Sequence, residues 1–372
     1  MSLPRLIVLT AACALLLAPL AQAEAPTPGE LAACKQKAID YLKTSQADDG
    51  TWTSPKTIGI SALATYSMLN AGVPEDDPAV RKGLDLIAAL SQPDGSLVVA
   101  GSRIPAYETS VAMLALQAGN KSGRYDEALK NAQQYLRGAQ ITEEDSVDST
   151  DLSYGGVGYS AQGGRPDLSN TAFFLEALQS AGVSSDDPAV QKAMTFVSRC
   201  QNLESSYNTS PEAAKINDGG FFYTVSAGGV SPAGQGPDGG LRSYGSMTYA
   251  GFKSMLYAGL EEDDPRVKAA VKWIGQNFTV KSNPGMGANG LYYYYYLFSK
   301  ALGASGVTQL EDENGVQHDW RGELASQLIA TQKPNGSWVN ADSNRWMEGD
   351  PNLVTAYVLV ALQSCDPAAK AE

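Results

Sequence analysis

Gln332-Lys-Pro-Asn-Gly-Ser-Trp338 is the stretch that decides the fold, because variants of it recur along the chain. Gln46-Ala-Asp-Asp-Gly-Thr-Trp52 repeats it near the other end, and Gln92-Pro-Asp-Gly-Ser-Leu97 is a shortened copy. Each copy reads as the end of a helix, a tight turn at Asp-Gly or Asn-Gly, and the entry to the next helix. A phrase that recurs with the same flanks indicates a repeat architecture.

Six units follow when these phrases are used as markers. Each unit begins with an amphipathic helix, which covers a surface, and continues with a more uniformly apolar helix, which must be buried. The amphipathic helices are expected at 31–46, 79–92, 126–140, 188–201, 265–276 and 320–332. The apolar helices are expected at 58–71, 105–118, 168–181, 245–258, 289–303 and 351–364. The alternation predicts an all-α fold, an α/α toroid in which six outer helices wrap six inner ones.

The helix ends carry regular signals. Asp76-Asp-Pro78, Asp186-Asp-Pro188 and Asp263-Asp-Pro265 each place an acidic residue before a proline, as at a helix N-terminus. These acid pairs also suit metal binding or catalysis, but capping explains both residue types and their recurrence. At the other ends, glycines are expected in a left-handed conformation after the inner helices, at Gly72, Gly119, Gly182 and Gly259.

The N-terminal region reads as an export signal. Arg5 precedes an apolar run over 6–20, and Ala21-Gln22-Ala23 supplies the small-x-small pattern of a cleavage site. A retained N-terminal anchor is the alternative. We predict an exported protein, periplasmic or extracellular, whose mature chain has no transmembrane span. The predicted division is a signal peptide over 1–23, a linker over 24–30, a single toroid domain over 31–366 and a tail over 367–372.

Charge and cysteine content narrow the partners. The 372 residues carry a net charge of −13, which becomes −14 when cleavage removes Arg5. An acidic chain without a basic cluster does not favour nucleic acid or anionic membranes as partners, and we expect a monomer. Cleavage also removes Cys13 and leaves Cys34, Cys200 and Cys365. In a closed ring the first outer helix meets the last inner helix, so we predict a Cys34–Cys365 disulfide.

Function is expected in the insertions that join each outer helix to the next inner helix, since the helices themselves are scaffold. In unit four, the segment Asn217-Asp-Gly-Gly-Phe-Phe-Tyr-Thr-Val225 suggests a small β-hairpin insertion. Unit five opens its inner helix with Gly290-Leu-Tyr-Tyr-Tyr-Tyr-Tyr-Leu-Phe298, and Asn344-Arg-Trp-Met-Glu-Gly-Asp-Pro-Asn352 precedes the inner helix of unit six. An aromatic-lined central cavity with polar groups at its rim is the expected ligand site, and the alternative is that the tyrosines fill the centre of the ring. The candidate ligand-binding residues are Tyr107, Glu108, Asn170, Tyr244, Tyr249, Tyr292, Tyr293, Tyr296, Trp320, Arg345, Trp346 and Asn352.

Two charged residues fall within apolar inner helices. Glu176 and Lys253 each lie six residues before a closing glycine, Gly182 and Gly259, and so occupy equivalent levels on adjacent inner helices. An unpaired charge there would be costly, which predicts a buried salt bridge between them, with catalysis as the alternative.

The turn phrases, the six helix pairs and the Ala/Leu-rich inner helices together resemble the terpenoid cyclase and protein prenyltransferase superfamily over roughly 30–365. More narrowly, the chain looks like the exported prenyltransferase and squalene oxidase repeat proteins. In squalene–hopene cyclases the Gln of such a phrase bonds to backbone groups and the Trp packs over the turn. The resemblance implies the same role for Gln332 and Trp338.

This chain also departs from the motifs of the families that it resembles. Class II cyclases protonate their substrate with Asp-x-Asp-Asp-Thr-Ala at the start of an inner helix, and the matching stretch is Asp167-Leu-Ser-Asn-Thr-Ala172. Ser169 and Asn170 replace the two acidic residues, so protonation is not expected at this position. Protein prenyltransferases hold zinc with Asp, Cys and His, whereas the single histidine, His318, lies in a loop between units. We therefore expect no metal site and no cofactor.

Three functional readings stay open. The first is an enzyme or binding protein for an isoprenoid-like apolar ligand. The second is a carbohydrate-active or carbohydrate-binding toroid, which would use rim carboxylates. The third is a non-catalytic interaction scaffold. The candidate catalytic residues are Asp167, Glu348 and Asp350, although Asp350 before Pro351 also fits a helix N-cap. A carbohydrate site would draw in addition on Glu108, Arg165, Arg242 and Arg345.

Overall fold

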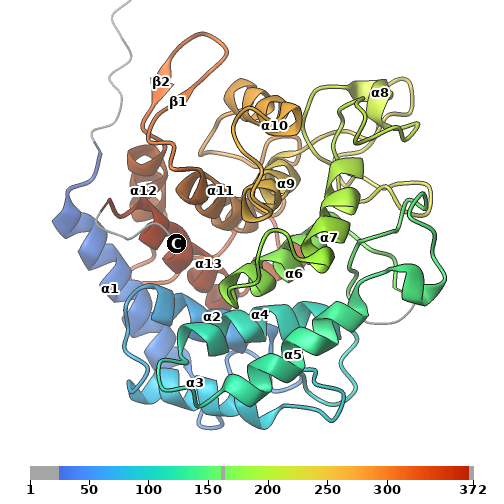
Figure 1. Ribbon diagram of the computed structural model, residues 1–372. Helices are drawn as coiled ribbons and strands as arrows, with labels where there is room; N and C mark the ends of the chain where they lie inside the picture. Colours follow the sequence, from blue (N-terminus) through green and yellow to red (C-terminus); the bar gives the residue numbers. More distant parts are fainter. Residues whose placement is uncertain (1–24, 161–163, 368–372) are drawn as a thin grey trace, which may run out of the picture.

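Six helices form the inner layer of a closed ring and six others wrap it, as the alternation of segments predicted (Figure 1). The computed structural model describes residues 25–160 and 164–367. The inner helices are α2 (Gly59–Asn70), α4 (Pro105–Ala118), α6 (Leu168–Ser180), α9 (Gly245–Tyr257), α11 (Leu291–Ser305) and α13 (Pro351–Cys365). The outer helices are α1 (Pro28–Ser45), α3 (Pro78–Ala89), α5 (Asp126–Ala139), α7 (Pro188–Arg199), α10 (Pro265–Gln276) and α12 (Trp320–Thr331). Each inner helix contacts the next, and α13 contacts α2, which closes the ring.

The burial pattern explains which helix takes which layer. Every residue of α2 from Gly59 to Met68 is buried, so this helix is covered on all sides. In α1 the buried residues lie along one face of the helix, at Leu31, Cys34, Ala38, Ile39 and Leu42. A stripe of this kind covers the inner layer and leaves the opposite face in solvent.

Four glutamines, one at each of four such turns, tie their own turn to the following outer helix. Gln332 Nε2 donates to the carbonyl of Gly336, within its own turn, and to the carbonyl of Cys34 in α1, both at 3.0 Å. The last unit is thereby joined to the first. The same pair of bonds is made by Gln46 to Gly50 and Ala79, by Gln140 to Gly155 and Ala189, and by Gln201 to Gly219 and Arg266.

The shortened copy of the phrase differs from the others. Gln92 Nε2 donates to the carbonyls of Leu90 and Val98 and makes no bond to α5. The tryptophans of the two full copies are buried, and the Trp52 and Trp338 indoles donate to carbonyls in the preceding outer helix. The phrases are structural in every copy.

The outer helices begin as predicted from the Asp-Asp-Pro sequences. The second aspartate of each pair, Asp77, Asp187 or Asp264, is the N-cap and accepts a backbone N–H two residues later. Asp77 and Asp187 also form ion pairs with Lys43 and Arg137 in the last turns of the preceding outer helices. Capping therefore accounts for these acids.

The closing glycines follow the prediction at three of four positions. Gly72, Gly182 and Gly259 have positive φ, between 73° and 88°. Gly119 has φ −98°, so the left-handed conformation predicted there is wrong. A different constraint applies to Gly119, because a Cβ there would lie 2.6 Å from Leu84 Cδ1. Its role is close packing of α4 against α3.

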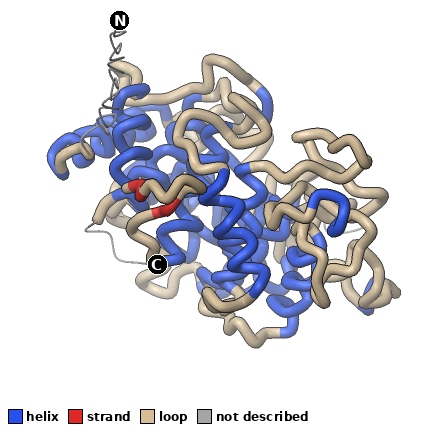
Figure 2. Tube along the Cα trace, turned by 90° about the horizontal axis from the view of Figure 1, so that it is seen from above, coloured by secondary structure: helices blue, strands red, loops and turns tan. Residues whose placement is uncertain are grey.

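The prediction of a β-hairpin in the unit-four insertion is wrong, because the paired strands lie between α11 and α12 instead. Among the described residues, the insertion after α7 contains the short helix α8 (Ala213–Ile216) and only isolated bridges, such as Thr224–Val230. Glycines with positive φ, including Gly219 and Gly228, turn the backbone before a ladder can extend. Such long loops, tan in Figure 2, separate several of the helices.

The two strands that the structure does contain lie elsewhere. β1 (Leu310–Glu311) and β2 (Gln317–His318) pair antiparallel in the loop between α11 and α12. His318, the single histidine, is in β2 and its Nδ1 lies 2.8 Å from Glu323 Oε1. This hairpin is at the periphery of the ring (Figure 1).

The predicted Cys34–Cys365 disulfide is absent, and both thiols are free and buried. α1 and α13 do pack together, as ring closure requires. The contacts that join them are polar and non-covalent: Lys35 Nζ lies 2.6 Å from Asp366 Oδ2, and Gln332 binds the Cys34 carbonyl. The thiols pack instead as small apolar groups.

The predicted signal peptide over 1–23, with its cleavage position near Ala23, lies outside the described residues. The first outer helix starts at Pro28, within the segment expected to be a linker, where Thr27 and Glu30 form a capping box. In the part of the chain that the structure describes, no helix combines the length and apolarity needed to cross a bilayer.

Candidate functional site

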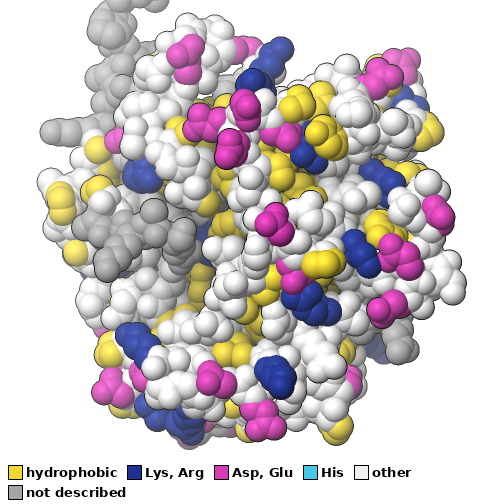
Figure 3. Space-filling view, in the orientation of Figure 1, with side chains coloured by type: hydrophobic (Ala, Val, Ile, Leu, Met, Phe, Trp, Pro, Cys, Tyr) yellow, Lys and Arg dark blue, Asp and Glu magenta, His cyan; other side chains and the backbone are white. Residues whose placement is uncertain are grey.

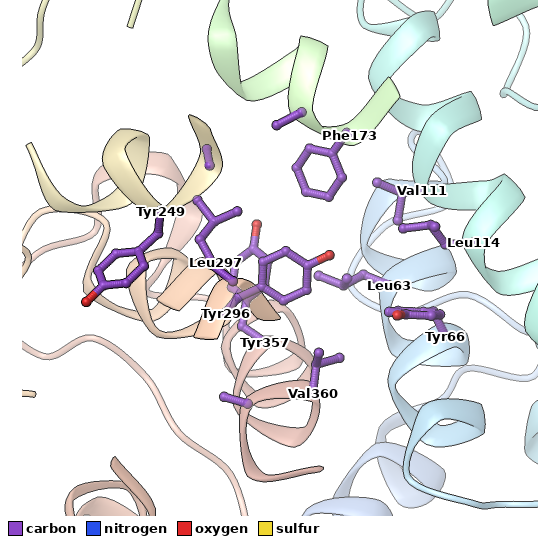
Figure 4. Packing of buried hydrophobic residues seen from close by; sticks show 14 of the residues in the cluster. Leu63, Tyr66, Val111, Leu114, Phe173, Tyr249, Tyr296, Leu297, Tyr357 and Val360 are labelled. Atoms are coloured by element: carbon purple, nitrogen blue, oxygen red, sulfur yellow. The ribbon is translucent and has the colours of Figure 1, made fainter. Parts of the chain in front are cut away.

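Aromatic and aliphatic side chains from several inner helices pack together at the centre of the ring, among them Phe173, Tyr296 and Tyr357 (Figure 4). The Phe173 ring of α6 lies 6.0 Å from that of Tyr296 and 5.3 Å from that of Tyr107, measured between centroids. Tyr357 of α13 approaches Tyr296 to 5.4 Å. Stacked and edge-to-face pairs of this kind stabilise the core beyond simple burial. At this level the axis of the ring is packed, and we therefore place the candidate site nearer the end where the insertions emerge.

On the side of Tyr296 away from the insertions, the same centre holds a buried ion cluster. Glu176 pairs with Lys253, as its level in the ring predicted, and also with Lys300 at 2.8 Å. The Tyr296 hydroxyl donates to Glu176 Oε1 at 3.0 Å. Burial alone would raise the pKa of Glu176, but the two ammonium groups hold it below its ordinary value. This cluster closes one end of the aromatic centre with charge.

A pair of hydroxyl groups lies toward the opposite, loop end. Ser169 Oγ in the first turn of α6 is 2.7 Å from the Tyr293 hydroxyl in the first turn of α11. Both residues are half-buried, as is Tyr107, and the Tyr293 ring stacks on Phe173 at 6.2 Å. These residues, with Asn170, are here named the mouth site: Tyr107, Ser169, Asn170, Phe173 and Tyr293.

Asp167 and Asn170 form the polar wall of the mouth site. Asp167 is the N-cap of α6, where its Oδ1 accepts the Asn170 backbone N–H at 2.9 Å and its Oδ2 accepts the Asn170 amide at 2.7 Å. Burial raises the pKa of Asp167 to about 6, although the bonds from Asn170 and the Tyr223 hydroxyl act in the opposite direction. Asn170 Oδ1 is buried and has no hydrogen-bond partner among the described residues. It is one of seven buried side-chain atoms without a hydrogen-bond partner among the described residues, and the one of these in the wall beside the Ser169–Tyr293 hydroxyls.

The other rim carboxylates also serve helix N-termini. Glu108 accepts the Ile58 N–H at the start of α2, at 2.8 Å. Glu348 accepts the Tyr293 N–H in α11 at 2.8 Å, and Asp350 is the N-cap of α13. Counting Asp167 on α6, the four acids stabilise four different inner helices. Each carboxylate accepts a backbone N–H at the start of a different inner helix, which argues against a catalytic pair among them.

Three predicted ligand-binding residues are buried away from the mouth site. Tyr249 and Trp320 pack against Phe298, with centroids 5.0 and 5.8 Å apart, and Tyr292 packs against Tyr295 at 5.6 Å. These residues fill the space between α11 and its neighbours.

The remaining candidates lie at the rim of the ring. Asn352 donates from its amide to Thr53 Oγ1 at 3.0 Å and so ties α13 to the first insertion. Tyr244 is the buried N-cap residue of α9. Arg345 and Trp346 are exposed, and the guanidinium stacks on the indole at 4.3 Å.

Sequence reasoning missed part of this site. Phe173 lies four residues after Ser169, on the same helix face, and this spacing was a usable signal. Tyr159 and Tyr223 approach Asp167 from two separate insertions. The sequence gives no periodic signal for these two tyrosines, because they lie in loops. Only the closed ring brings those loops next to α6.

Solved structures place the ring among known folds. A variant of the type II terpene cyclase MstE from Scytonema superimposes with a TM-score of 0.56 at 14% identity, covering 91% of this chain and 98% of that chain. This chain has the fold of the type II terpene cyclase. The resemblance inferred from the turn phrases is confirmed at that level. Another variant of MstE, with the same values, is in complex with geranylgeranyl dihydroxybenzoate, its substrate.

Proteins of other functions share the same toroid. A possible member of the GH105 family from Klebsiella pneumoniae has a TM-score of 0.56 at 11% identity and covers 96% of this chain and 98% of that chain. A polysaccharide lyase has a TM-score of 0.54 at 10% identity and covers 91% and 97%. No family model and no curated protein matches the sequence. At such identities the likeness shows the fold alone, and function has to be argued from the site.

Proposed function

We propose that the protein binds a small, predominantly apolar molecule of the isoprenoid class at the mouth site and does not protonate it. The observation that carries this proposal is the hydroxyl pair of Ser169 and Tyr293 above the Phe173 ring, beside the unpartnered Asn170 Oδ1. Half-buried aromatic faces suit the methyl-branched body of an isoprenoid. The free acceptor of Asn170 suits a single hydroxyl group at one end. A polyprenyl alcohol combines both features.

The same residues argue for binding over cyclisation. Ser169 stands where the resemblance would put a protonating acid, and an alcohol is too weak an acid for that step. The nearest carboxyl, Asp167, is committed to Asn170 and to the N-terminus of α6. Its role is to orient the Asn170 amide, so that Oδ1 is presented to a ligand. The structure of MstE with a geranylgeranyl substrate supports an isoprenoid as the first ligand to test.

Carbohydrate binding is the second candidate, and one observation favours it. The Tyr159 ring is 41% exposed and lies 6.4 Å from the Tyr107 ring, which gives two aromatic faces on which a sugar could stack. The engagement of the four rim carboxylates in helix capping counts against hydrolysis or elimination. A carbohydrate function would therefore be binding, as for the leading proposal.

Equilibrium dialysis of the purified protein against farnesol, geranylgeraniol and a panel of neutral and acidic oligosaccharides tests the two candidates together. Ser169→Leu fills the mouth site, and we expect it to weaken terpenol binding by at least about tenfold, the loss typical of a blocked central contact. Ser180→Leu is the matched control, since Ser180 is a half-buried serine at the far end of the same helix, and it should bind as the wild type. Binding of the oligosaccharides alone would establish the second candidate. Binding of none of the three would overturn the proposal.

A further inference from the structure

Trp346 differs from every other tryptophan in the chain. The sequence contains five, and Trp52, Trp273, Trp320 and Trp338 are at most 4% exposed. Trp346 is 46% exposed, and the adjacent Met347 is 51% exposed. Two neighbouring large apolar side chains in solvent forgo the favourable free energy that burial would provide. Their exposure therefore points to a ligand that covers them.

The backbone at this position is also strained. Trp346 has φ 56° and ψ 35°, and Met347 has φ 65°. Positive φ is uncommon outside glycine, and bulky residues rarely adopt it. Two such residues in succession persist only where the surroundings impose them, and strain of this kind clusters at ligand clamps.

The surroundings that impose it are visible at the base of the segment. The Asn340 N–H donates to the Glu348 carbonyl at 2.8 Å, and the Asn340 amide donates to Glu348 Oε2 at 2.7 Å. Glu348 Oε1 in turn accepts the Tyr293 N–H. Residues 340–348 therefore form a loop with a fixed base and an exposed tip. The base is joined to the same helical turn that carries the Tyr293 hydroxyl.

The indole lies beside the start of α11. A Cβ on Gly290, three residues before Tyr293, would be 3.0 Å from Trp346 Cζ3. The guanidinium carbon of Arg345 also lies over the ring, 4.3 Å from its centroid. The indole thus contacts the backbone at Gly290 and the Arg345 guanidinium at the rim of the mouth site, while Trp346 stays 46% exposed.

We propose that Trp346, fixed by the strained 340–348 loop, is the residue that covers the apolar body of the isoprenoid bound at the mouth site. This rests on the proposed function and adds a contact that the cyclase resemblance does not supply. The ligand would extend from the Ser169–Tyr293 hydroxyls, past Gly290, to the exposed face of the indole. An acyclic chain of several isoprene units has that extended form, so geranylgeraniol should bind better than farnesol.

Acrylamide quenching of tryptophan fluorescence tests this directly, because only one of the five tryptophans is accessible. We expect geranylgeraniol to remove most of the quenchable emission of the wild type. Trp346→Phe should lack that quenchable fraction and keep its affinity, whereas Trp346→Ala should bind at least about fivefold more weakly. Affinities come from equilibrium dialysis, which does not depend on fluorescence.

The outcomes separate the two proposals. Binding by dialysis, with Trp346 still quenched and Trp346→Ala binding as the wild type, would overturn the covering role and leave the proposed function standing. Absence of binding by dialysis would overturn both. Met347→Gly provides a readout without ligand, since glycine adopts positive φ freely and should raise the melting temperature. An unchanged or lower melting temperature would contradict the strain that supports the inference.

Discussion

Gln332 donates a hydrogen bond at 3.0 Å to the carbonyl of Cys34, which lies 298 positions earlier in the chain. The other glutamines join a turn to the outer helix of the next unit, whereas Gln332 joins the last turn of the chain to the first outer helix. With the Lys35–Asp366 ion pair, it joins the last unit to the first. The ring is closed by hydrogen bonds and packing where the sequence had suggested a disulfide.

Gln332→Ala should therefore lower the free energy of unfolding by about 1–3 kcal/mol, the usual loss when buried backbone acceptors lose their donor. Gln92→Ala is the matched control, because the Gln92 amide bonds only within its own turn. Gln92→Ala should lower the free energy of unfolding clearly less than Gln332→Ala. Urea unfolding followed by circular dichroism gives both values, and equal losses would contradict a special role for ring closure.

The thiols give a second prediction. Burial raises the pKa of Cys34 to about 11, and burial likewise raises the pKa of Cys365, so neither should react readily in the folded state. For a chain that begins at residue 24 and so lacks Cys13, we expect no thiol titratable with an aromatic disulfide reagent under native conditions, and three in denaturant without reductant. Reductant should leave the melting temperature unchanged. A single titratable thiol in denaturant would restore the disulfide.

The buried ion cluster should be sensitive to loss of its carboxylate. Glu176→Gln keeps the shape but leaves the Lys253 and Lys300 ammonium groups buried without the negative charge that they share. Breaking a buried pair in this way typically costs ~3–5 kcal/mol. Lys192→Met removes the more exposed Lys192–Glu143 pair, which should cost under about 1 kcal/mol. Similar losses in the two variants, measured by urea unfolding, would show that the cluster is not closed to solvent.

Asp167 predicts a specific pH dependence. Burial raises its pKa to about 6 from an ordinary value of 3.8, so the folded chain keeps a proton that the unfolded chain has released. The stability from this group is fully present below about pH 4 and is lost as the pH rises through about 6. Asp167→Asn keeps an amide that can cap α6 and does not titrate.

The measurement is the free energy of unfolding of both proteins between pH 4 and pH 7. The wild type should lose stability relative to Asp167→Asn as the pH rises over this interval. A difference that is constant, or that grows in favour of the wild type, would show that Asp167 is ionised throughout.

The helical ring could be predicted from the sequence because its signals are local. Asp-Asp-Pro starts, glycine ends and the glutamine phrases mark the elements, and Glu176 and Lys253 could be paired by counting from Gly182 and Gly259. The hairpin could not be placed in the same way. The glycines of the unit-four insertion are compatible with loop turns as well as with the ends of strands, so they do not locate a hairpin. The cysteines were near in topology, but nearness of two helices does not place two thiols within bonding distance.

The site was harder to predict than the fold. Five consecutive tyrosines led to the prediction of an aromatic cavity. However, the Tyr294 and Tyr295 hydroxyls donate to the backbone carbonyls of residues 279 and 280, away from the centre of the ring. The carboxylates that looked catalytic are required by helix N-termini. Acidic and basic side chains are interspersed on the face shown in Figure 3, so surface charge does not mark a site there either. What remains distinctive is Ser169 with its partner Tyr293.

Photocrosslinking tests the central claim, a ligand at the mouth site, most directly. A farnesyl or geranylgeranyl analogue that carries a diazirine would be irradiated with the purified protein, and the labelled peptides mapped by mass spectrometry. We predict labels within 104–110, 168–174 and 290–297, with a further label at 344–348, and their loss in Ser169→Leu and on competition with geranylgeraniol. Competable labelling confined to other segments, unchanged by Ser169→Leu, would contradict the account.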